Sequence, residues 1–331
     1  MKREERAPAS PAVANEGIAV SREILDDSRA YDPGSHPRSN RVRAFLRLVA
    51  IEHSVFALPF AYLAALTAMT TTTGRVNWAD LGLITAAMVG ARTFAMAANR
   101  VIDRRIDARN PRTAGRELVT GAVSVRTAWT GAAIALVVFL AAAAALNPLC
   151  LLLAPLALVP LVVYPYGKRF TDWPHAILAV AQVVGPVGAW LGVTGALGAS
   201  GPAWVLGAAV GLWIGGFDLI YAGQDAEVDR VIGVRSVPAR YGVRFALRLS
   251  AAIHAVTFVL FVWFGALVGL GWLWWVGLAL AAAAFVYEHA IVTAADLSRV
   301  NRAFFTANGF VGIALFVFAL ADLVVRLGLR A

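Results

Sequence analysis

The sequence predicts an all-α membrane protein with nine transmembrane helices. Of its 331 residues 60% are hydrophobic and only 15% are charged, whereas soluble domains are about 45–50% apolar and about 25% charged. Apolar stretches near the length of about 20 residues that spans a bilayer as a helix recur along almost the whole chain. Membrane β-strands would show short alternating segments instead, so a polytopic helical bundle is the fold class that fits.

The nine expected spans follow one another from the first long apolar run to the C-terminus. They lie at residues 46–70, 78–100, 126–146, 148–166, 174–196, 203–223, 246–267, 271–292 and 303–325. Asn147-Pro148 separates the third span from the fourth and predicts a tight turn. Residues 1–44 are polar and rich in Pro and Gly, which predicts a disordered tail before a transmembrane domain of residues 45–331.

The positive charges predict the orientation of this bundle. If the nine spans alternate, 25 of the 29 Lys and Arg residues fall on the side of the N-terminus and three on the other side. Positive loops mark the cytoplasmic face, so we expect a multi-pass protein of the inner or plasma membrane with a cytoplasmic N-terminus. Anionic lipid accounts for the net charge of +9, and no nucleic-acid partner is needed.

Acidic residues gather in two of the cytoplasmic connections. Asp103 and Asp107 follow the second span, and Asp225 and Asp229 follow the sixth. On a helix, the i, i+4 spacing within each pair puts both carboxylates on one face, and Asn99 extends the first row by one turn. Single pairs of this kind are ordinarily solvated partners of nearby arginines, but two rows separated by four spans favour a shared site.

Two stacked carboxylates repel each other unless a cation lies between them. Hard oxygen ligands select Mg²⁺ or Mn²⁺, and Mg²⁺ usually takes one or two carboxylates and completes its shell with water and phosphate oxygens. The two rows therefore predict metal clusters that hold one diphosphate. Tyr164 and Lys168 in a third cytoplasmic connection repeat the i, i+4 spacing, and Lys168 would add a positive charge that binds phosphate.

Three motifs resemble those of the UbiA superfamily of intramembrane aromatic prenyltransferases. They are "NRVIDRRIDARNPRTAGRELVTG", "YPYGKRFT" and "YAGQDAEVDRVIGVRS", in the order expected of that family, and the likeness runs from about Arg41 to the C-terminus. "IEHSVFALPFAY" and "YEHAIVTAADLSRVNRAFFTANGF" are most similar to the bacterial 4-hydroxybenzoate polyprenyltransferase subgroup, and within it to the menaquinone members of the futalosine route. Position 100 is Arg where many relatives carry Asp.

The resemblance implies transfer of a polyprenyl group from polyprenyl diphosphate to an aromatic hydroxy acid, either 1,4-dihydroxy-6-naphthoate or 4-hydroxybenzoate. Mg²⁺ would rest on Asn99, Asp103, Asp107, Asp225 and Asp229. Lys168, Arg112 and Arg116 would share the diphosphate charge. Tyr164, with Tyr221 second, would face the allylic cation, and Ser236 completes the Gly-x-x-Ser element of the third motif.

Ionisable residues inside the spans are costly and usually functional or paired. Arg92 and Asp218 each lie two turns before an acidic row, which predicts an interhelical ion pair or, for Arg92, contact with the acceptor carboxylate. Glu52 could help to remove the ring proton. We expect His175 and His254 to be satisfied interior residues, because no second His or Cys stands at ligand spacing, and Glu288-His289 to form a cap or network.

Two other classes of membrane protein fit parts of the pattern. Nine spans with a weak repeat permit a transporter that uses the Asp clusters for ions, but transporter sites lie near the bilayer midplane, and these carboxylates gather at one surface. A CDP-alcohol phosphotransferase needs a glycine after its aspartates, whereas Asp107 is followed by "ARN". The oligomeric state is left open by the sequence.

Overall fold

The computed structural model describes residues 41–49 and 54–330. Within this part of the chain the regular structure is helical, and pairing between extended residues is limited to an isolated bridge of Arg75 with Arg330. Most of the expected disordered tail, residues 1–40, lies outside the described residues, as does Glu52. The end of the expected tail begins helix α2 (Arg41–Leu48).

Among the described residues, nine long helices follow α2, with the longest connections between α4 and α5 and between α8 and α11. The long helices are α3 (Ser54–Thr72), α4 (Trp78–Asp107), α5 (Val125–Leu146), α6 (Pro148–Phe170), α7 (Pro174–Thr194), α8 (Gly201–Ala222), α11 (Val243–Val268), α12 (Trp272–Ile291) and α14 (Asn308–Val325). The short helices are η2 (Gly223–Asp225), α9 (Ala226–Ile232), α10 (Val237–Tyr241), α13 (Val300–Arg302) and η3 (Ala303–Ala307).

Eight helical segments are long and apolar enough to cross a membrane, and Ala57–Thr72 of α3 forms a shorter apolar helix at the place of the first expected span. The all-α, multi-pass class predicted from the sequence is therefore confirmed. The count of nine is close: it differs only in the first span, part of which, residues 50–53, lies outside the described residues.

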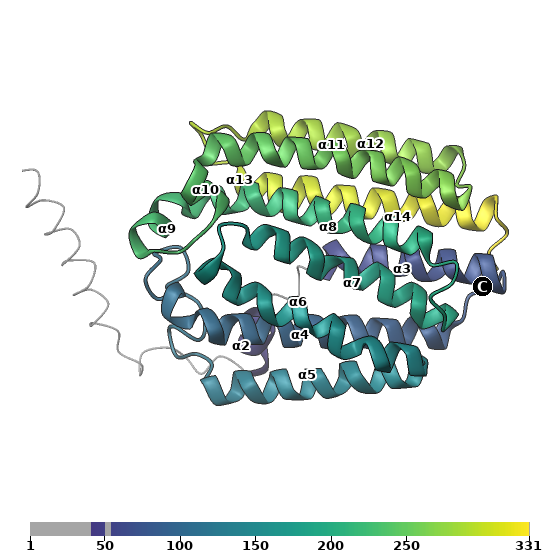
Figure 1. Ribbon diagram of the computed structural model, residues 1–331, viewed down its shortest axis with the longest axis horizontal. Coiled ribbons are helices and arrows are strands. Elements are labelled where there is room, and N and C mark those ends of the chain that lie inside the picture. The colour runs from purple at the N-terminus through teal and green to yellow at the C-terminus, as the bar shows by residue number, and fades with distance from the viewer. Residues whose placement is uncertain (1–40, 50–53, 331) are drawn as a thin grey trace, which may run out of the picture. The chain divides into compact units, whose positions relative to one another are not determined.

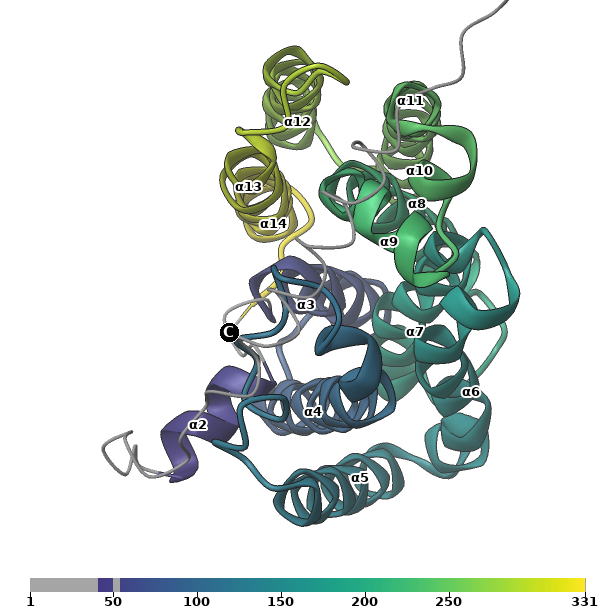
Figure 2. The same ribbon diagram turned by 90° about the vertical axis from the view of Figure 1, so that its left-hand side faces the viewer.

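The long helices lie side by side, and the short ones gather at one end (Figure 1). Seen along the helices, α4, α5, α6 and α7 form one group, α8, α11, α12 and α14 form the other, and α3 lies between them (Figure 2). Within the groups, α4 packs on α5, α8 on α11 and α12 on α14, and α7 packs on α8 across them. Helix α3 packs on both α7 and α14.

Side-chain caps fix where several helices begin. Asn147 is extended, with φ −171° and ψ 164°, and its Oδ1 accepts a hydrogen bond from the Cys150 N–H at the start of α6. Its Nδ2 donates to the carbonyl oxygens of Leu191 and Gly192 at the end of α7. A single asparagine thus makes the predicted turn before Pro148 and ties it to a third helix.

Helix α8 is the most enclosed of the candidate spans, with 78% of its apolar window buried. Trp213 on α8 is fully buried, and its ring packs edge-on against Phe60 and Phe217. Aromatic rings in such edge-to-face packing give α8 a well-defined position. Because α8 also carries Asp218 and Tyr221 and leads directly to Asp225, its position fixes these polar side chains.

The two ends of the bundle differ in chemistry. The end that carries the short helices also carries both acidic rows and their arginines (Figure 1). At the other end, Val76 and Arg330 pair through their backbones, and Asp322 Oδ2 accepts hydrogen bonds from the N–H groups of Gly271 and Trp274 at the start of α12. The acidic and basic residues that the sequence predicts at one face of the membrane therefore lie at one end of the bundle.

Candidate active site

A cavity of about 390 Å³ opens among α4, α6, α7, α8 and the loops that follow α4 and α9. Eleven of the twelve site residues expected from the sequence line it. They are Arg92, Asn99, Asp107, Arg112, Arg116, Tyr164, Lys168, Tyr221, Asp225, Asp229 and Ser236. The twelfth, Asp103, is fully buried and contacts the cavity through Lys168. Residues from three separate parts of the sequence, 92–116, 164–168 and 221–236, thus meet at one polar site.

Asp103 joins α4 to the end of α6. Its Oδ2 lies 2.7 Å from Lys168 Nζ, and its Oδ1 lies 3.1 Å from Arg169 Nη1. Arg169 also donates hydrogen bonds to the backbone oxygens of Pro165 and Ile102. A buried carboxylate is stable only when it is paired and hydrogen-bonded, and these two cations from one helix meet that requirement while placing Lys168 at the cavity.

Asp107, one turn further along α4, is 4% exposed and is bound by the loop that follows it. Arg116 Nη1 lies 2.6 Å from its Oδ1, and Thr113 Oγ1 donates to its backbone oxygen. The loop therefore folds back over the end of α4, which brings Arg112 and Arg116 to the cavity.

Asp225 and Asp229 belong to two successive short helices. Helix α8 ends at Ala222, Asp225 lies at the end of η2, and Asp229 lies in α9. The continuous helix implied by the i, i+4 spacing is therefore interrupted between these two residues. Both carboxylates still line the cavity, because the chain continues in the same direction through the tighter turn.

Arg112 holds Asp225 with its guanidinium group. Its Nε donates to Asp225 Oδ1 at 2.8 Å, and its Nη2 donates to Asp225 Oδ2. Its Nη1 donates to the hydroxyl of Tyr221, and the guanidinium lies 5.1 Å from the centre of that ring. Burial disfavours the charge of Arg112, but the hydrogen bond and charge of Asp225 outweigh it and raise the pKa of the guanidinium.

Asp229 is positioned by the turn that ends α9. Gly233 has a left-handed backbone, with φ +74°, and closes α9 so that the chain can turn back. Ser236 then donates from Oγ to Asp229 Oδ2 at 3.3 Å and caps α10 by accepting from the Ala239 N–H. Ser236 thus orients a carboxylate and starts a helix, which gives the Gly-x-x-Ser spacing a structural reason.

Asn110 and Arg169 were overlooked in the sequence interpretation. Asn110 is 6% exposed, its Nδ2 donates to Asp225 Oδ1 at 3.0 Å, and its Oδ1 accepts from the Arg112 N–H. Asn110 therefore links the loop that follows Asp107 to Asp225. The sequence signal for Asn110 is its position three residues after Asp107, inside the first motif. Arg169 directly follows Lys168 in the motif "YPYGKRFT", which is the sequence signal for it.

His175 provides a partner for Asp218 that the sequence interpretation did not foresee. Its Nδ1 lies 2.6 Å from Asp218 Oδ2, and both residues line the cavity. Its Nε2 is buried and has no hydrogen-bond partner among the described residues. Since a carboxylate accepts the proton on Nδ1, Nε2 carries the lone pair of this imidazole. Arg92, for which the sequence predicts either an ion pair with Asp218 or contact with the acceptor carboxylate, lines the cavity as well.

The donor atoms of the cavity suit a hard divalent cation. The carboxylates of Asp107, Asp225 and Asp229 and the amides of Asn99 and Asn110 supply oxygen ligands, and among the described residues that line the cavity His175 is the sole nitrogen or sulfur ligand of the histidine or cysteine kind. Donor sets dominated by oxygen suit Mg²⁺. The residues present therefore fit Mg²⁺.

Two apolar cavities adjoin the polar one in sequence, each sharing lining residues with the one before it. The first, of about 130 Å³, shares Arg92, Asn99 and Tyr164 with the polar cavity. The second, of about 100 Å³, shares Met88 and Gly185 with the first. Both are lined by α4, α6 and α7, and the second also by α5. The three cavities form a series that is charged at one end and apolar at the other.

Known proteins resemble this chain over most of its length. A sequence model of the UbiA prenyltransferase family matches residues 57–310. The 4-hydroxybenzoate octaprenyltransferase of Cupriavidus necator is 30% identical over 279 residues, which cover 83% of this chain and 95% of that protein. The protein of the same name from Pseudomonas aeruginosa is 33% identical over 228 residues, which cover 69% and 76%.

Solved structures show the same fold. The apo structure of a UbiA homologue from Aeropyrum pernix K1 superposes with a TM-score of 0.75 at 38% identity, covering 82% of this chain and 98% of that one. A UbiA homologue from Archaeoglobus fulgidus, bound to DMAPP and Mg²⁺, superposes with a TM-score of 0.65 at 22% identity and covers 85% and 99%.

Proposed function

Because the chain belongs to the UbiA prenyltransferase family, we propose that it transfers a polyprenyl group from polyprenyl diphosphate to an aromatic hydroxy acid. The single observation that carries this proposal is a row of adjoining cavities, in which carboxylates and cations line the first cavity and mostly apolar side chains line the next two. A polyprenyl diphosphate has the same polarity along its length. The 4-hydroxybenzoate octaprenyltransferases that are similar to this chain support an aromatic acceptor.

The diphosphate of the donor would occupy the polar end of the cavity. We propose that Asn99, Asp103, Asp107, Asp225 and Asp229 hold Mg²⁺ there, either directly or through water. Bound Mg²⁺ would neutralise the diphosphate oxygens and make the diphosphate a better leaving group. Lys168, Arg112 and Arg116, which pair with the carboxylates in this structure, carry the additional positive charge that a diphosphate needs.

The prenyl chain of the donor would enter the apolar cavities between α4, α6 and α7. Gly185 lines both of these cavities, and a Cβ added there would lie 3.3 Å from Met88 Cε. A glycine at this position therefore keeps the passage open. Apolar lining favours a hydrocarbon chain through the hydrophobic effect, and it explains why the site lies inside a membrane protein.

The acceptor would lie between the diphosphate and the apolar passage. Tyr164 lines both the polar and the first apolar cavity, where its ring can stabilise an allylic cation, and Tyr221 is held by Arg112 from the loop that follows α4. Arg92 lines the same two cavities and offers a positive charge to the carboxylate of the acceptor. These three side chains define the proposed acceptor site.

The reaction then has a complete balance of bonds and protons. The C–O bond of the donor breaks, and diphosphate leaves with the electron pair. A ring carbon beside the acceptor hydroxyl forms the new C–C bond, and the proton on that carbon must be removed to restore aromaticity. We propose His175 as the base, because it lines the cavity, its Nε2 has no hydrogen-bond partner among the described residues, and Asp218 would stabilise the imidazolium that forms.

The direct test supplies membranes that contain the protein with labelled polyprenyl diphosphate and Mg²⁺. 4-Hydroxybenzoate and 1,4-dihydroxy-6-naphthoate are offered in separate reactions, and we expect a prenylated product from one of them. Asp296→Asn changes a carboxylate in an exposed loop outside the cavity and serves as the matched control, with activity retained. Absence of product with both acceptors would contradict the proposal.

The compartment follows from the same proposal. The chain is a multi-pass membrane protein, and we propose that it lies in the inner or plasma membrane with the acidic end facing the cytoplasm. The excess of arginine at that end supports this orientation. Ubiquinone or menaquinone synthesis is the pathway to which either acceptor would belong.

A further inference from the structure

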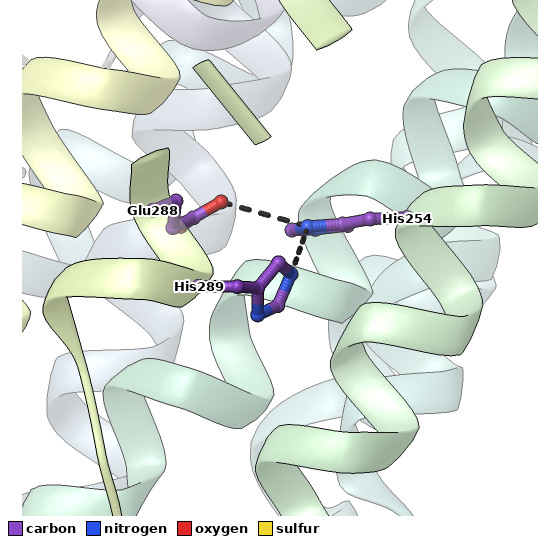
Figure 3. Close-up of side chains that lie close together, drawn as sticks. All are labelled: His254, Glu288 and His289. Atoms are coloured by element: carbon purple, nitrogen blue, oxygen red, sulfur yellow. Dashed lines mark hydrogen bonds and ion pairs between the residues drawn. The ribbon is translucent and has the colours of Figure 1, made fainter. Parts of the chain in front are cut away.

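A second cluster of ionisable side chains lies between α11 and α12, outside the residues that line the polar cavity. It consists of His254 on α11 and of Glu288 and His289 on α12 (Figure 3). His254 Nδ1 lies 3.0 Å from His289 Nε2 and 3.5 Å from Glu288 Oε2. His254 is 2% exposed and Glu288 is 1% exposed. Three metal-binding side chains therefore converge on one point in the bundle.

The backbone of α8 fixes the orientation of His254. His254 Nε2 lies 3.2 Å from the carbonyl oxygen of Trp213, and a carbonyl oxygen can only accept a hydrogen bond. Nε2 therefore carries the proton, and Nδ1 presents its lone pair to His289 and Glu288. Gly216 allows the ring to sit against α8, because a Cβ there would lie 2.6 Å from the imidazole. Ligating histidines in proteins are oriented in this way by their second nitrogen.

Glu288 has one satisfied oxygen and one that lacks a partner. Its Oε1 accepts a hydrogen bond from Asn308 Nδ2 at 2.7 Å, and Asn308 Oδ1 accepts from the indole N–H of Trp213. Its Oε2 is buried without a hydrogen-bond partner among the described residues and points at His254 (Figure 3). A buried carboxylate oxygen without a partner is costly, and a bound cation would remove that cost.

The spacing of the three atoms suits a tetrahedral metal ion. Ligands about 2.0–2.1 Å from zinc in a tetrahedral site lie roughly 3.4 Å from one another, and the two distances from His254 Nδ1, 3.0 and 3.5 Å, bracket that value. All three ligand atoms lie within 4.8 Å of one another. Two imidazoles and one carboxylate form a donor set that zinc uses, with a fourth position left for water.

We propose that His254 Nδ1, His289 Nε2 and Glu288 Oε2 bind a Zn²⁺ ion that is separate from the Mg²⁺ site of the cavity. His289 is half-buried, which gives the ion a route from the surface. The ion joins α11 to α12, and the bonds of His254 to Trp213 and of Glu288 to Asn308 connect it to α8 and α14. Its role is to stabilise the packing of these four helices.

Zinc content is the primary test. The full chain, purified in detergent with an affinity tag that contains no histidine, is supplied with zinc and dialysed against excess Mg²⁺ to keep zinc from the carboxylates of the cavity. We expect about one zinc per chain by mass spectrometry, and less than about a tenth of that in His289→Gln and Glu288→Gln. His175→Gln removes a buried histidine from α7 and should retain the metal.

Two further measurements show where the ion binds. X-ray absorption at the zinc edge should report two imidazole nitrogens and one carboxylate oxygen at about 2.0–2.2 Å. Zinc should raise the melting temperature of the unaltered chain by several degrees but leave that of His289→Gln unchanged. Glu288→Gln is isosteric and can still accept from Asn308, so loss of zinc in that variant does not depend on misfolding.

Two results would overturn the proposal. One is an unaltered chain that keeps no zinc after dialysis. The other is equal zinc content in the unaltered chain, His289→Gln and Glu288→Gln, which would place the ion elsewhere. Neither result bears on prenyl transfer, because that reaction is measured separately with Mg²⁺ and the donor.

Discussion

The polar cavity and the α11–α12 cluster use ionisable residues in opposite ways. Around the cavity, each of Asp103, Asp107 and Asp225 is paired with a lysine or arginine. In the α11–α12 cluster, Glu288 meets two histidines, and its Oε2 lacks a hydrogen bond. The cavity lies at the ends of helices, where loops supply cations, whereas the cluster lies between helices that carry few charges.

This difference explains which ligand each region can accept. A lysine or arginine that pairs with a carboxylate at a helix end can bind a substrate phosphate instead. Phosphate and carboxylate are both negatively charged, and the cavity gives the substrate access to the cation. In the α11–α12 cluster, no lysine or arginine of the described residues pairs with Glu288, so two imidazoles and a carboxylate can bind a small metal ion. The predictions below test this division, beginning with the largest expected effect.

Removing one carboxylate of the cavity should affect catalysis and leave the α11–α12 cluster intact. We expect Asp107→Asn and Asp225→Asn each to lower the turnover of prenyl transfer on the order of 10³-fold, since charge stabilisation at a leaving group is lost. Zinc content should not change in either variant. Turnover like that of the unaltered chain in both would contradict the proposed roles of the acidic rows.

Substitution of His175 tests whether a histidine acts as the base in the cavity. His175→Gln should lower kcat by about 10²-fold, as loss of a general base does, with little change in the KM of either substrate. Asp218→Asn should also lower kcat, because Asp218 acts on the reaction through the imidazole of His175. Steady-state rates with both substrates varied provide the measurement, and a change confined to KM would assign His175 to binding instead.

Substitutions in the two apolar cavities should affect prenyl transfer through the size of the new side chain and not through its charge. Gly185→Val adds atoms where a Cβ already approaches Met88, so we expect the KM for a long polyprenyl diphosphate to rise about 10-fold. Geranyl diphosphate should be affected much less, because its chain is short. Gly198→Val, in a loop where an added Cβ meets nothing within 4 Å, is the matched control. Equal effects on long and short donors would indicate that the prenyl chain binds outside these two cavities.

Residues outside both regions should affect stability alone. Asn147→Ala removes the cap of α6 and the bonds to the end of α7, which should cost about 1 kcal/mol of folding free energy. Asn147→Asp keeps the acceptor for the Cys150 N–H but loses donation to α7, so its effect separates the two roles. Unfolding in detergent followed by circular dichroism measures both variants, and a loss of activity without loss of stability would be unexpected.

Much of the fold could be predicted from composition and spacing. Apolar runs of bilayer length fix where helices lie, because a chain in lipid must satisfy its backbone hydrogen bonds within each segment. The Asn147-Pro148 turn was also predictable, since a cap and a proline act locally. Most of the candidate site followed from its residues and from the family resemblance, because Asp103, Asp107, Asp225 and Asp229 lie in short recurring motifs.

The sequence by itself therefore determined the membrane class, the spans and the residues that meet at the acidic end. Only the tertiary structure decided which of them pair. Asp218 meets His175 from α7, Asn110 reaches Asp225, and His254 meets Glu288 and His289 from α12. The physical reason is that spacing along one helix predicts neighbours within that helix, whereas contacts between helices depend on how their side chains pack in three dimensions.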